Sequence, residues 1–327
     1  MHRFDWVEPR SLEEAHAALR EHGDDAKLMA GGTALMLLMR QGLVQPGVIV
    51  SLQRVPGLDQ IAARDGGIRI GALCTHRRVE THPLVRERFP ALHETLERVA
   101  TIRIRNMGTI GGNLAHSDPA QDPPPTLLAL GASVQVAGPD GARSIPLDEF
   151  FTDYYENALR PGEVLTAIEV PDQAGSFNGS GPAGARYVQA FSKFLPRSVD
   201  DYATVAVAVS MAISGPADRP TPPAPPPDAG RGADAGARGA ASLSGEWRCE
   251  DVRIGLGSAG PTPLRARGAE AALRGQALTA ATLREAGEAA AAECDPLADV
   301  RGSAEYKREM VKVWLARTVR RALERRD

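Results

Sequence analysis

Two short segments of the chain place consecutive glycines beside a small hydroxyl residue. The first runs from Ala30 to Thr33 and contains Gly31 and Gly32, and the second runs from Thr109 to Asn113. Because glycine has no side chain, its N–H group can approach an anion closely, and successive N–H groups form anion-binding nests. The first pair is also expected to open a helix, whose N-terminal dipole favours a phosphate. Together the segments predict a diphosphate gripped between two parts of the fold.

Residue type alone also allows structural interpretations of the polar residues. Neither glycine pair has the G-x-G-x-x-G spacing, which disfavours a Rossmann dinucleotide loop. Asp122 precedes three prolines, a position that is typical of a turn residue. Lys193 could be a solvated charge on a strand. Tyr202 could be a core residue whose hydroxyl reaches the surface. The run from His116 to Asp118 could suggest hydrolytic or metal chemistry, but one such pair is more typical of a loop, and we assign it none.

The elements that must position these residues begin with a small α/β unit over 1–56. Ser11 and Glu14 have the capping-box spacing, and apolar residues follow at helical spacing, which predicts a helix ending near Gly23. Buried strands are predicted over 27–30 and 48–52, with a helix over 33–40 between them.

A strand-rich unit over 57–174 is predicted next. Its expected elements are a hairpin over 61–72, a helix over 91–100, and strands over 133–137, 143–146 and 163–170. A Gly/Ser/Pro hinge over 173–184 separates it from a third unit over 185–327. That unit is predicted to have strands over 187–193, 204–213 and 252–256, and helices over 264–274, 279–293 and 303–325. Residues 215–245 are rich in proline, glycine and alanine, which predicts a disordered insertion.

Composition excludes several classes of function. The net charge of -3 provides no basic field for nucleic acid. The cysteines Cys74, Cys249 and Cys294 are widely spaced, so no iron–sulfur or zinc site held by this chain alone is expected. Charged residues near the N-terminus predict no secretory signal, and hence a cytoplasmic protein. The apolar stretch over 28–39 is far shorter than the roughly 20 residues that span a bilayer, so no membrane span is expected.

Longer motifs carry a family resemblance. They are AGGTAL (30–35), RIRNMGTIGGNLAHSDPAQDPPPTLLAL (103–130), DEFFTDYYENALRPGEVLTAIEVP (148–171), AFSKFLPRSVDDYATVAVAVSMA (190–212) and CEDVRIGLGSAGPTPLRARGAEAALRG (249–275). The chain resembles the flavin subunit of molybdenum hydroxylases, a family that includes the medium subunit of carbon monoxide dehydrogenase and the FAD domain of xanthine dehydrogenase. Nearly the whole chain is covered, apart from 215–245.

The resemblance implies an α+β fold, in which a two-subdomain FAD-binding fold of the vanillyl-alcohol-oxidase-like type precedes a C-terminal domain of a small antiparallel sheet with a helical cluster. It places the FAD diphosphate on both glycine segments. Asp122 would accept hydrogen bonds from ribose hydroxyls, Leu165 would touch the ring system, Lys193 would lie near the pyrimidine edge, and Tyr202 against the ring face. The implied FAD-binding residues are Leu28, Met29, Ala30, Gly31, Gly32, Thr33, Ala34, Leu35, Thr109, Ile110, Gly111, Gly112, Asn113, Asp122, Leu165, Lys193 and Tyr202.

The sequence departs from the family pattern at two positions. Ala34 stands where the family often has a polar side chain, so a side-chain bond to phosphate is absent there. Pro196 interrupts a segment that is usually continuous in the family. The resemblance therefore does not fix the course of the backbone between Lys193 and Arg197.

The implied function is electron transfer within a complex. FAD would receive electrons from a small subunit with two 2Fe–2S clusters, after substrate hydroxylation on a large molybdenum-binding subunit, and would pass them to an external acceptor. A dimer of heterotrimers is expected, with the molybdenum cofactor and the clusters only on partner subunits. No residue of this chain is assigned a catalytic or metal-binding role. The alternatives are a self-sufficient FAD-dependent oxidase or reductase of the same fold, and a flavin-free scaffold.

Overall fold

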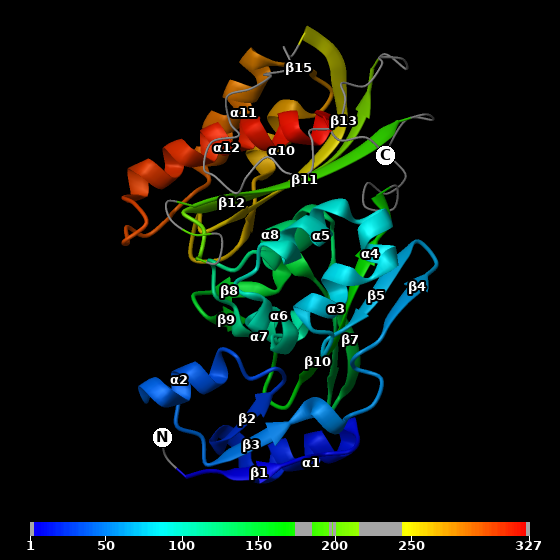
Figure 1. The fold of residues 1–327 in the computed structure, drawn as a ribbon, viewed down its shortest axis with the longest axis vertical. Helices are drawn as coiled ribbons and strands as arrows, with labels where there is room; N and C mark the ends of the chain where they lie inside the picture. Colours follow the sequence, from blue (N-terminus) through cyan, green and yellow to red (C-terminus); the bar gives the residue numbers. More distant parts are fainter. Residues whose placement is uncertain (1–2, 174–184, 196–197, 199–200, 216–243, 325–327) are drawn as a thin grey trace.

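The computed structural model describes residues 3–173, 185–195, 198, 201–215 and 244–324. These form a mixed helix and sheet structure in which the three larger sheets follow one another along the long axis of the molecule (Figure 1). We call the parts around them the first unit (residues 5–51), the second unit (residues 61–171) and the third unit (the described residues of 186–324). The predicted hinge over 173–184 and the predicted insertion over 215–245 lie, except for their end residues, outside the described residues.

The first unit is a three-stranded parallel sheet with two helices. The strand order is β1-β3-β2, and β3 is buried along its whole length. Ser11 caps the first helix by accepting from the Glu14 N–H, as predicted, but the Glu14 carboxylate accepts from the Arg10 N–H. The reciprocal capping box is therefore not closed. The elements are β1 (Asp5–Val7), α1 (Leu12–His22), β2 (Ala26–Met29), α2 (Leu35–Gln41) and β3 (Val48–Ser51).

The second unit is a five-stranded antiparallel sheet, in which the predicted hairpin over 61–72 and the predicted strands over 133–137, 143–146 and 163–170 are confirmed. The order is β4-β5-β10-β6-β7, and β10 has an irregularity between Leu165 and Ala167. Buried residues of the sheet, such as Ile68 and Ile70, share one core with Leu92, Leu96 and other helix residues. The strands are β4 (Ile61–Arg64), β5 (Gly67–Gly71), β6 (Ser133–Gly138), β7 (Gly141–Pro146) and β10 (Val164–Pro171), with a separate pair β8 (Phe151–Asp153) and β9 (Glu156–Asn157).

The helices of the second unit were largely missed from the sequence. Only the helix over 91–100 was predicted; it is α5, and it ends earlier, at Glu97. The others are short and begin at threonine caps or prolines, which fix a first turn without a long apolar period. The helices of this unit are α3 (His76–Thr81), α4 (Pro83–Arg88), α5 (Pro90–Glu97), α6 (Ile102–Met107), α7 (Ile110–His116) and α8 (Pro123–Ala129).

The third unit is an antiparallel sheet covered by helices. Its first two strands match the prediction, whereas β13 begins at Ser244, earlier than predicted, and the region predicted as a helix from 264 starts with the short strand β14. The elements are β11 (Arg186–Phe194), β12 (Val205–Ser214), β13 (Ser244–Gly257), β14 (Leu264–Arg265), α10 (Arg267–Leu273), β15 (Ala277–Thr279), α11 (Ala280–Ala292) and α12 (Ala304–Glu324). Among the described residues, no helix is long and apolar enough to cross a membrane.

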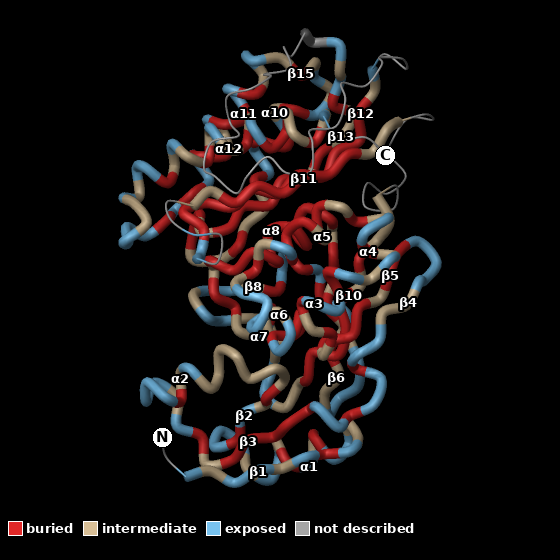
Figure 2. Tube along the Cα trace, viewed as in Figure 1, coloured by how far each residue is buried: buried red, intermediate tan, exposed pale blue. Residues whose placement is uncertain are grey.

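The second and third units meet through a buried interface. Helix α12 packs on one side of β11 and β12, while α5 and α8 pack against β11, β12 and β13, so β11 and β12 are buried along most of their length (Figure 2). The backbones approach closely at Gly255 of β13, where an added Cβ would lie 1.9 Å from the carbonyl oxygen of Pro125 in α8. Helix α8 can therefore rest directly on the sheet only because residue 255 is glycine.

Replacement of Gly255 by valine is expected to separate α8 from the sheet. The valine side chain would overlap backbone atoms that cannot rotate away. We therefore expect the free energy of unfolding to fall by at least about 3 kcal/mol, as for severe overpacking of a core. Thermal unfolding followed by circular dichroism measures it. Ala62→Val on β4, where the side chain is only partly buried, is the control and should unfold near the wild-type temperature. A Gly255→Val chain that unfolds with the control would show that this contact is not tight.

Candidate functional site

The two glycine segments lie against each other. Gly31, in the loop between β2 and α2, packs on the turn between α6 and α7, so that an added Cβ would lie 1.9 Å from the Met107 carbonyl oxygen. An added Cβ on Gly112 would lie 3.5 Å from the Cβ of Ala30. The fold thus joins segments from two sheets that are distant in sequence. The contact of Gly31 with Met107 requires the absence of a side chain, whereas Gly112 and Ala30 lie at an ordinary packing distance.

The backbone N–H groups of the two segments are used differently. Among the described residues, those of Gly31 to Ala34 donate to no other group of the chain. In the second segment the N–H groups of Ile110 and Gly111 donate to the carbonyls of Cys74 and Ala72, both at 2.9 Å. Only the first segment therefore offers several N–H groups to an anion. The sequence predicts an anion-binding nest in both segments, but the structure leaves the N–H groups for one only in the first.

The second segment is the first turn of a helix, which was not predicted. Thr109 is the N-cap of α7, and its side chain accepts from the Gly112 N–H at 3.1 Å. Asn113 donates to the Thr109 carbonyl at 2.9 Å. Conversely, α2 begins at Leu35, so the first glycine pair precedes its helix by two residues, although Met36 already donates to the Gly32 carbonyl at 3.0 Å. Gly32 has a φ of +72°, which favours glycine.

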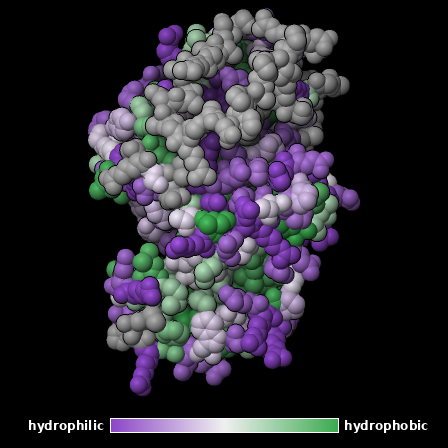
Figure 3. All heavy atoms as spheres, viewed as in Figure 1, coloured by the Kyte–Doolittle hydropathy of each residue, from purple (hydrophilic) through white to green (hydrophobic). Residues whose placement is uncertain are grey.

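The residues that flank the first glycine pair mainly pack the loop. Met29 lies against Gly32, since an added Cβ there would lie 3.1 Å from its sulfur atom. Leu35 and Met36 pack on the cluster of Met29, Met39 and Ile49, while Leu28 packs on the neighbouring clusters. In Figure 3 apolar side chains gather over this first unit, where α2 lies.

Three buried oxygen atoms from α7 to the start of α8 accept no hydrogen bond from the described residues. They are Asn113 Oδ1, Gln121 Oε1 and Asp122 Oδ1. A buried acceptor without a donor is costly, so such atoms indicate a ligand that supplies N–H or O–H groups. Hydroxyl groups of a sugar or polyol chain have this chemistry. Gln121 was missed from the sequence, because a glutamine in a loop carries no motif of its own.

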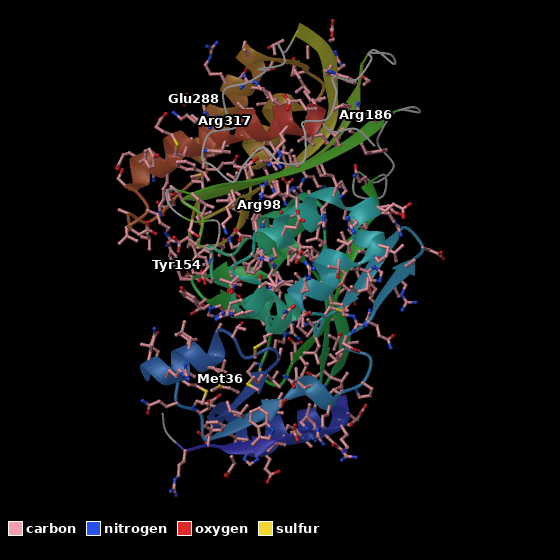
Figure 4. All side chains as sticks on the ribbon, in the orientation of Figure 1. Met36, Arg98, Tyr154, Arg186, Glu288 and Arg317 are labelled. Carbon is pink, nitrogen blue, oxygen red and sulfur yellow. The ribbon has the colours of Figure 1, made fainter. Side chains whose placement is uncertain are left out.

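Asp122 and Lys193 form a buried ion pair between the second and third units. Lys193 Nζ lies 2.8 Å from Asp122 Oδ2, and the two side chains are 2% and 6% exposed. The ammonium also donates to the Arg98 carbonyl at 3.0 Å. Arg98 follows α5 and lies where that helix meets the third sheet (Figure 4). Burial raises the pKa of the Asp122 carboxyl to about 6, against the opposing effects of Lys193 and Arg98. Two residues that the resemblance assigned to different parts of a cofactor are thus in direct contact.

The remaining predicted residues are placed separately. Leu165 is 6% exposed and lies in the core of the second unit. Tyr202 is 48% exposed, and the Arg301 guanidinium lies 5.7 Å from its ring centroid. Burial, followed by the negative charge of Asp118, raises the pKa of the Tyr202 hydroxyl.

Comparison with known proteins decides the family. A family model described as the FAD binding domain in molybdopterin dehydrogenase matches residues 2–173, which is more than half of the chain. A second model, the CO dehydrogenase flavoprotein C-terminal domain, matches residues 231–322. The chain belongs to this family. It is an FAD-binding chain of the oxidoreductase class, and the resemblance predicted from the sequence is confirmed.

Similar proteins cover the chain over almost its full length. The carbon monoxide dehydrogenase medium chain of Hydrogenophaga pseudoflava is 33% identical over 99% of this chain and 98% of its own length. The 6-hydroxypseudooxynicotine dehydrogenase complex subunit alpha of Paenarthrobacter nicotinovorans is 33% identical over 98% of this chain and 95% of its own length. In the solved carbon monoxide dehydrogenase of Hydrogenophaga pseudoflava, one chain matches with a TM-score of 0.82, 34% identity and 98% coverage of both chains. A chain of quinoline 2-oxidoreductase from Pseudomonas putida matches with a TM-score of 0.80, 29% identity and coverage of 98% and 97%.

The two glycines of α7 are expected to have separable roles. An added Cβ on Gly111 would lie 2.5 Å from the Cβ of Ala72 in the core, whereas on Gly112 it would meet Thr109 Oγ1 at 2.8 Å and face Ala30. Gly112→Ala should lower FAD occupancy. It should reduce the free energy of unfolding by only about 1 kcal/mol, which is the typical effect of a weakened N-cap. Gly111→Ala should instead lower the unfolding temperature of the FAD-free chain strongly. Flavin absorbance per chain and thermal unfolding distinguish them, and equal effects of both variants on both readouts would contradict this division.

The buried ion pair should give the protein a defined pH dependence. Because the folded pKa of Asp122 lies above the ordinary value of 3.8, the folded chain holds a proton that the unfolded chain has released between those two pH values. The contribution of Asp122 to stability is therefore present at low pH and is lost as the pH rises through about 6. Wild type should gain stability from pH 7 to pH 5 relative to Asp122→Asn/Lys193→Met, which lacks both charges. Parallel pH profiles in urea unfolding would refute the raised pKa.

Proposed function

We propose that the chain is the FAD-binding, electron-transferring medium subunit of a heteromeric molybdenum hydroxylase. It would take electrons from 2Fe–2S clusters of a small partner subunit and pass them to an external acceptor, while a large partner subunit holds the molybdenum cofactor and hydroxylates the substrate. Similarity over nearly full length to the medium chain of carbon monoxide dehydrogenase supports this assignment. A dimer of heterotrimers and a cytoplasmic location remain part of the proposal.

The first two units would form the two subdomains of a vanillyl-alcohol-oxidase-like FAD fold, over 1–56 and 57–174. The third, over 185–327, would be the C-terminal flavoprotein domain, with the insertion over 215–245. The observation that carries the FAD site is the contact between the glycine segments. A diphosphate would lie on the N–H groups of Gly31 to Ala34, close to the start of α7, in a cradle that a Cβ would fill.

The chain's own residues would bind and orient FAD from three sides. Asn113, Gln121 and Asp122 offer buried oxygens to hydroxyl groups, and the last of them also holds Lys193. Because the carboxylate and the ammonium are 2.8 Å apart, they would meet one part of the ligand, where ribityl hydroxyls join the ring's pyrimidine edge. Leu165 and Tyr202 would contact the ring. When bound, FAD supplies the ability to accept electrons one at a time and release them singly or in pairs.

The proposal is tested by comparing the chain alone with the chain co-expressed with molybdenum-binding and ferredoxin-like partners. The purified chain should bind FAD, shown by visible flavin absorbance that survives gel filtration. Its flavin should be bleached by an organic substrate or carbon monoxide only in the complex. A wild-type chain that takes up no FAD in either form would overturn the proposal, and bleaching of the isolated chain by a substrate would support a self-sufficient oxidase instead.

A further inference from the structure

A buried carboxylate that the proposed function does not use lies in α5, at the junction of the second and third units. Glu94 is 3% exposed, and its Oε1 atom pairs with two guanidinium groups. The guanidinium of Arg98, one turn later in the chain, lies at 2.9 Å, and that of Arg321 approaches from α12. One carboxylate therefore joins the end of α5 to the last helix of the chain.

Both guanidinium groups also donate to one carbonyl of the third sheet. Arg98 Nη1 lies 3.4 Å, and Arg321 Nη1 3.1 Å, from the carbonyl oxygen of Phe191 in β11. Two like charges that share one acceptor repel each other, and the Glu94 carboxylate offsets that repulsion because it pairs with both. Removal of its charge would leave two cations close together around a neutral carbonyl. Glu94 therefore fixes the Arg98 side chain against β11.

The backbone at this end of α5 accepts hydrogen bonds from two other elements. Arg98 is the C-cap of α5, and its carbonyl accepts from Lys193 Nζ of β11 at 3.0 Å. Arg105 Nη1 of α6 donates to the carbonyls of Val99 and Ala100 at 3.0 and 2.9 Å. Carbonyls at the end of a helix lack partners within it and carry partial negative charge, which favours a cation there. The place of the Lys193 ammonium is thus coupled to the backbone at Arg98.

We propose that Glu94 is a positioning residue, which acts through Arg98 to fix the Lys193 ammonium and thereby raises the reduction potential of the flavin. The Asp122 carboxylate and the Arg98 carbonyl hold this ammonium at 2.8 and 3.0 Å. A cation at the pyrimidine edge stabilises negative charge on the reduced ring, and this effect weakens with distance. The inference rests on the proposed function, since it needs FAD beside Lys193.

The test compares the midpoint potential of FAD in variants of the full chain. Each chain is loaded with FAD and reduced stepwise under anaerobic conditions, in equilibrium with a redox dye of known potential. Glu94→Gln keeps the shape of the side chain and removes its charge. It should lower the two-electron potential by about 30 mV, which corresponds to a tenfold weaker preference for reduced over oxidised flavin. Arg98→Met breaks the same link from the other side and should cause a similar shift.

A double variant and a matched control separate positioning from general damage to the fold. Lys193→Met should lower the potential by more than Glu94→Gln, and adding Glu94→Gln to it should cause no further shift, because the cation through which Glu94 acts is gone. Glu288→Gln is the control. Glu288 of α11, labelled in Figure 4, also pairs with α12, since its carboxylate lies 2.7 Å from Lys312 Nζ. This variant should have the wild-type potential.

An unchanged potential in Glu94→Gln, or an equal shift when it is added to Lys193→Met, overturns the inference. A shift in Glu288→Gln as large as that in Glu94→Gln also overturns it, because any loosening of α12 would then be sufficient. If Glu94→Gln does not fold, the potential of Arg98→Met decides in the same way. Failure of the wild-type chain to bind FAD would instead refute the proposed function, on which the inference rests.

Discussion

Close backbone contact at glycine is the constraint on which the rest of this structure depends. The loop after β2 reaches the turn between α6 and α7 because Gly31 has no Cβ to meet the Met107 carbonyl. The third unit reaches α8 in the same way, through Gly255 and Pro125. Both neighbours of the second unit are therefore joined to it by backbone contacts. The starts of α7 and α8, which carry Thr109 and Asp122, lie near these two joints, and so does the candidate site.

Elements with a local pattern could be predicted from the sequence, and elements defined by tertiary packing could not. The hairpin around Asp65 to Gly67 and the pair over 133–146 were recognised because alternation and turn residues are local signals. Helix α7 contains two glycines and α8 begins with three prolines, both of which oppose a helix prediction. These helices form because Thr109 caps the first, proline is accepted in the first turn of the second, and both are buried against the sheets.

The types of site residue could be predicted, but not their partners. Asp122 and Lys193 are 71 residues apart, and nothing in either neighbourhood indicates that they meet. The N–H groups of Ile110 and Gly111 are occupied by carbonyls of Ala72 and Cys74, which no motif links to the glycine pair. Polar loop residues such as Gln121 were missed, because a turn explains them equally well until burial is known.

The third unit contributes to the site through charge and aromatic side chains, and its placement is therefore critical. Burying Asp122 with Lys193 gains little stability by itself, because desolvation of both charges opposes their attraction. The pair is supported by the Arg98 carbonyl, and Arg98 also pairs with Glu94, which in turn contacts Arg321 of α12. The same end of α5 thus anchors both Lys193 and the last helix. In the proposed site a diphosphate would need only the first two units, whereas the side chains that would face the ring are set by how the third unit docks. Separation of the third unit would therefore first alter the chemistry of the ring and only afterwards the retention of the cofactor.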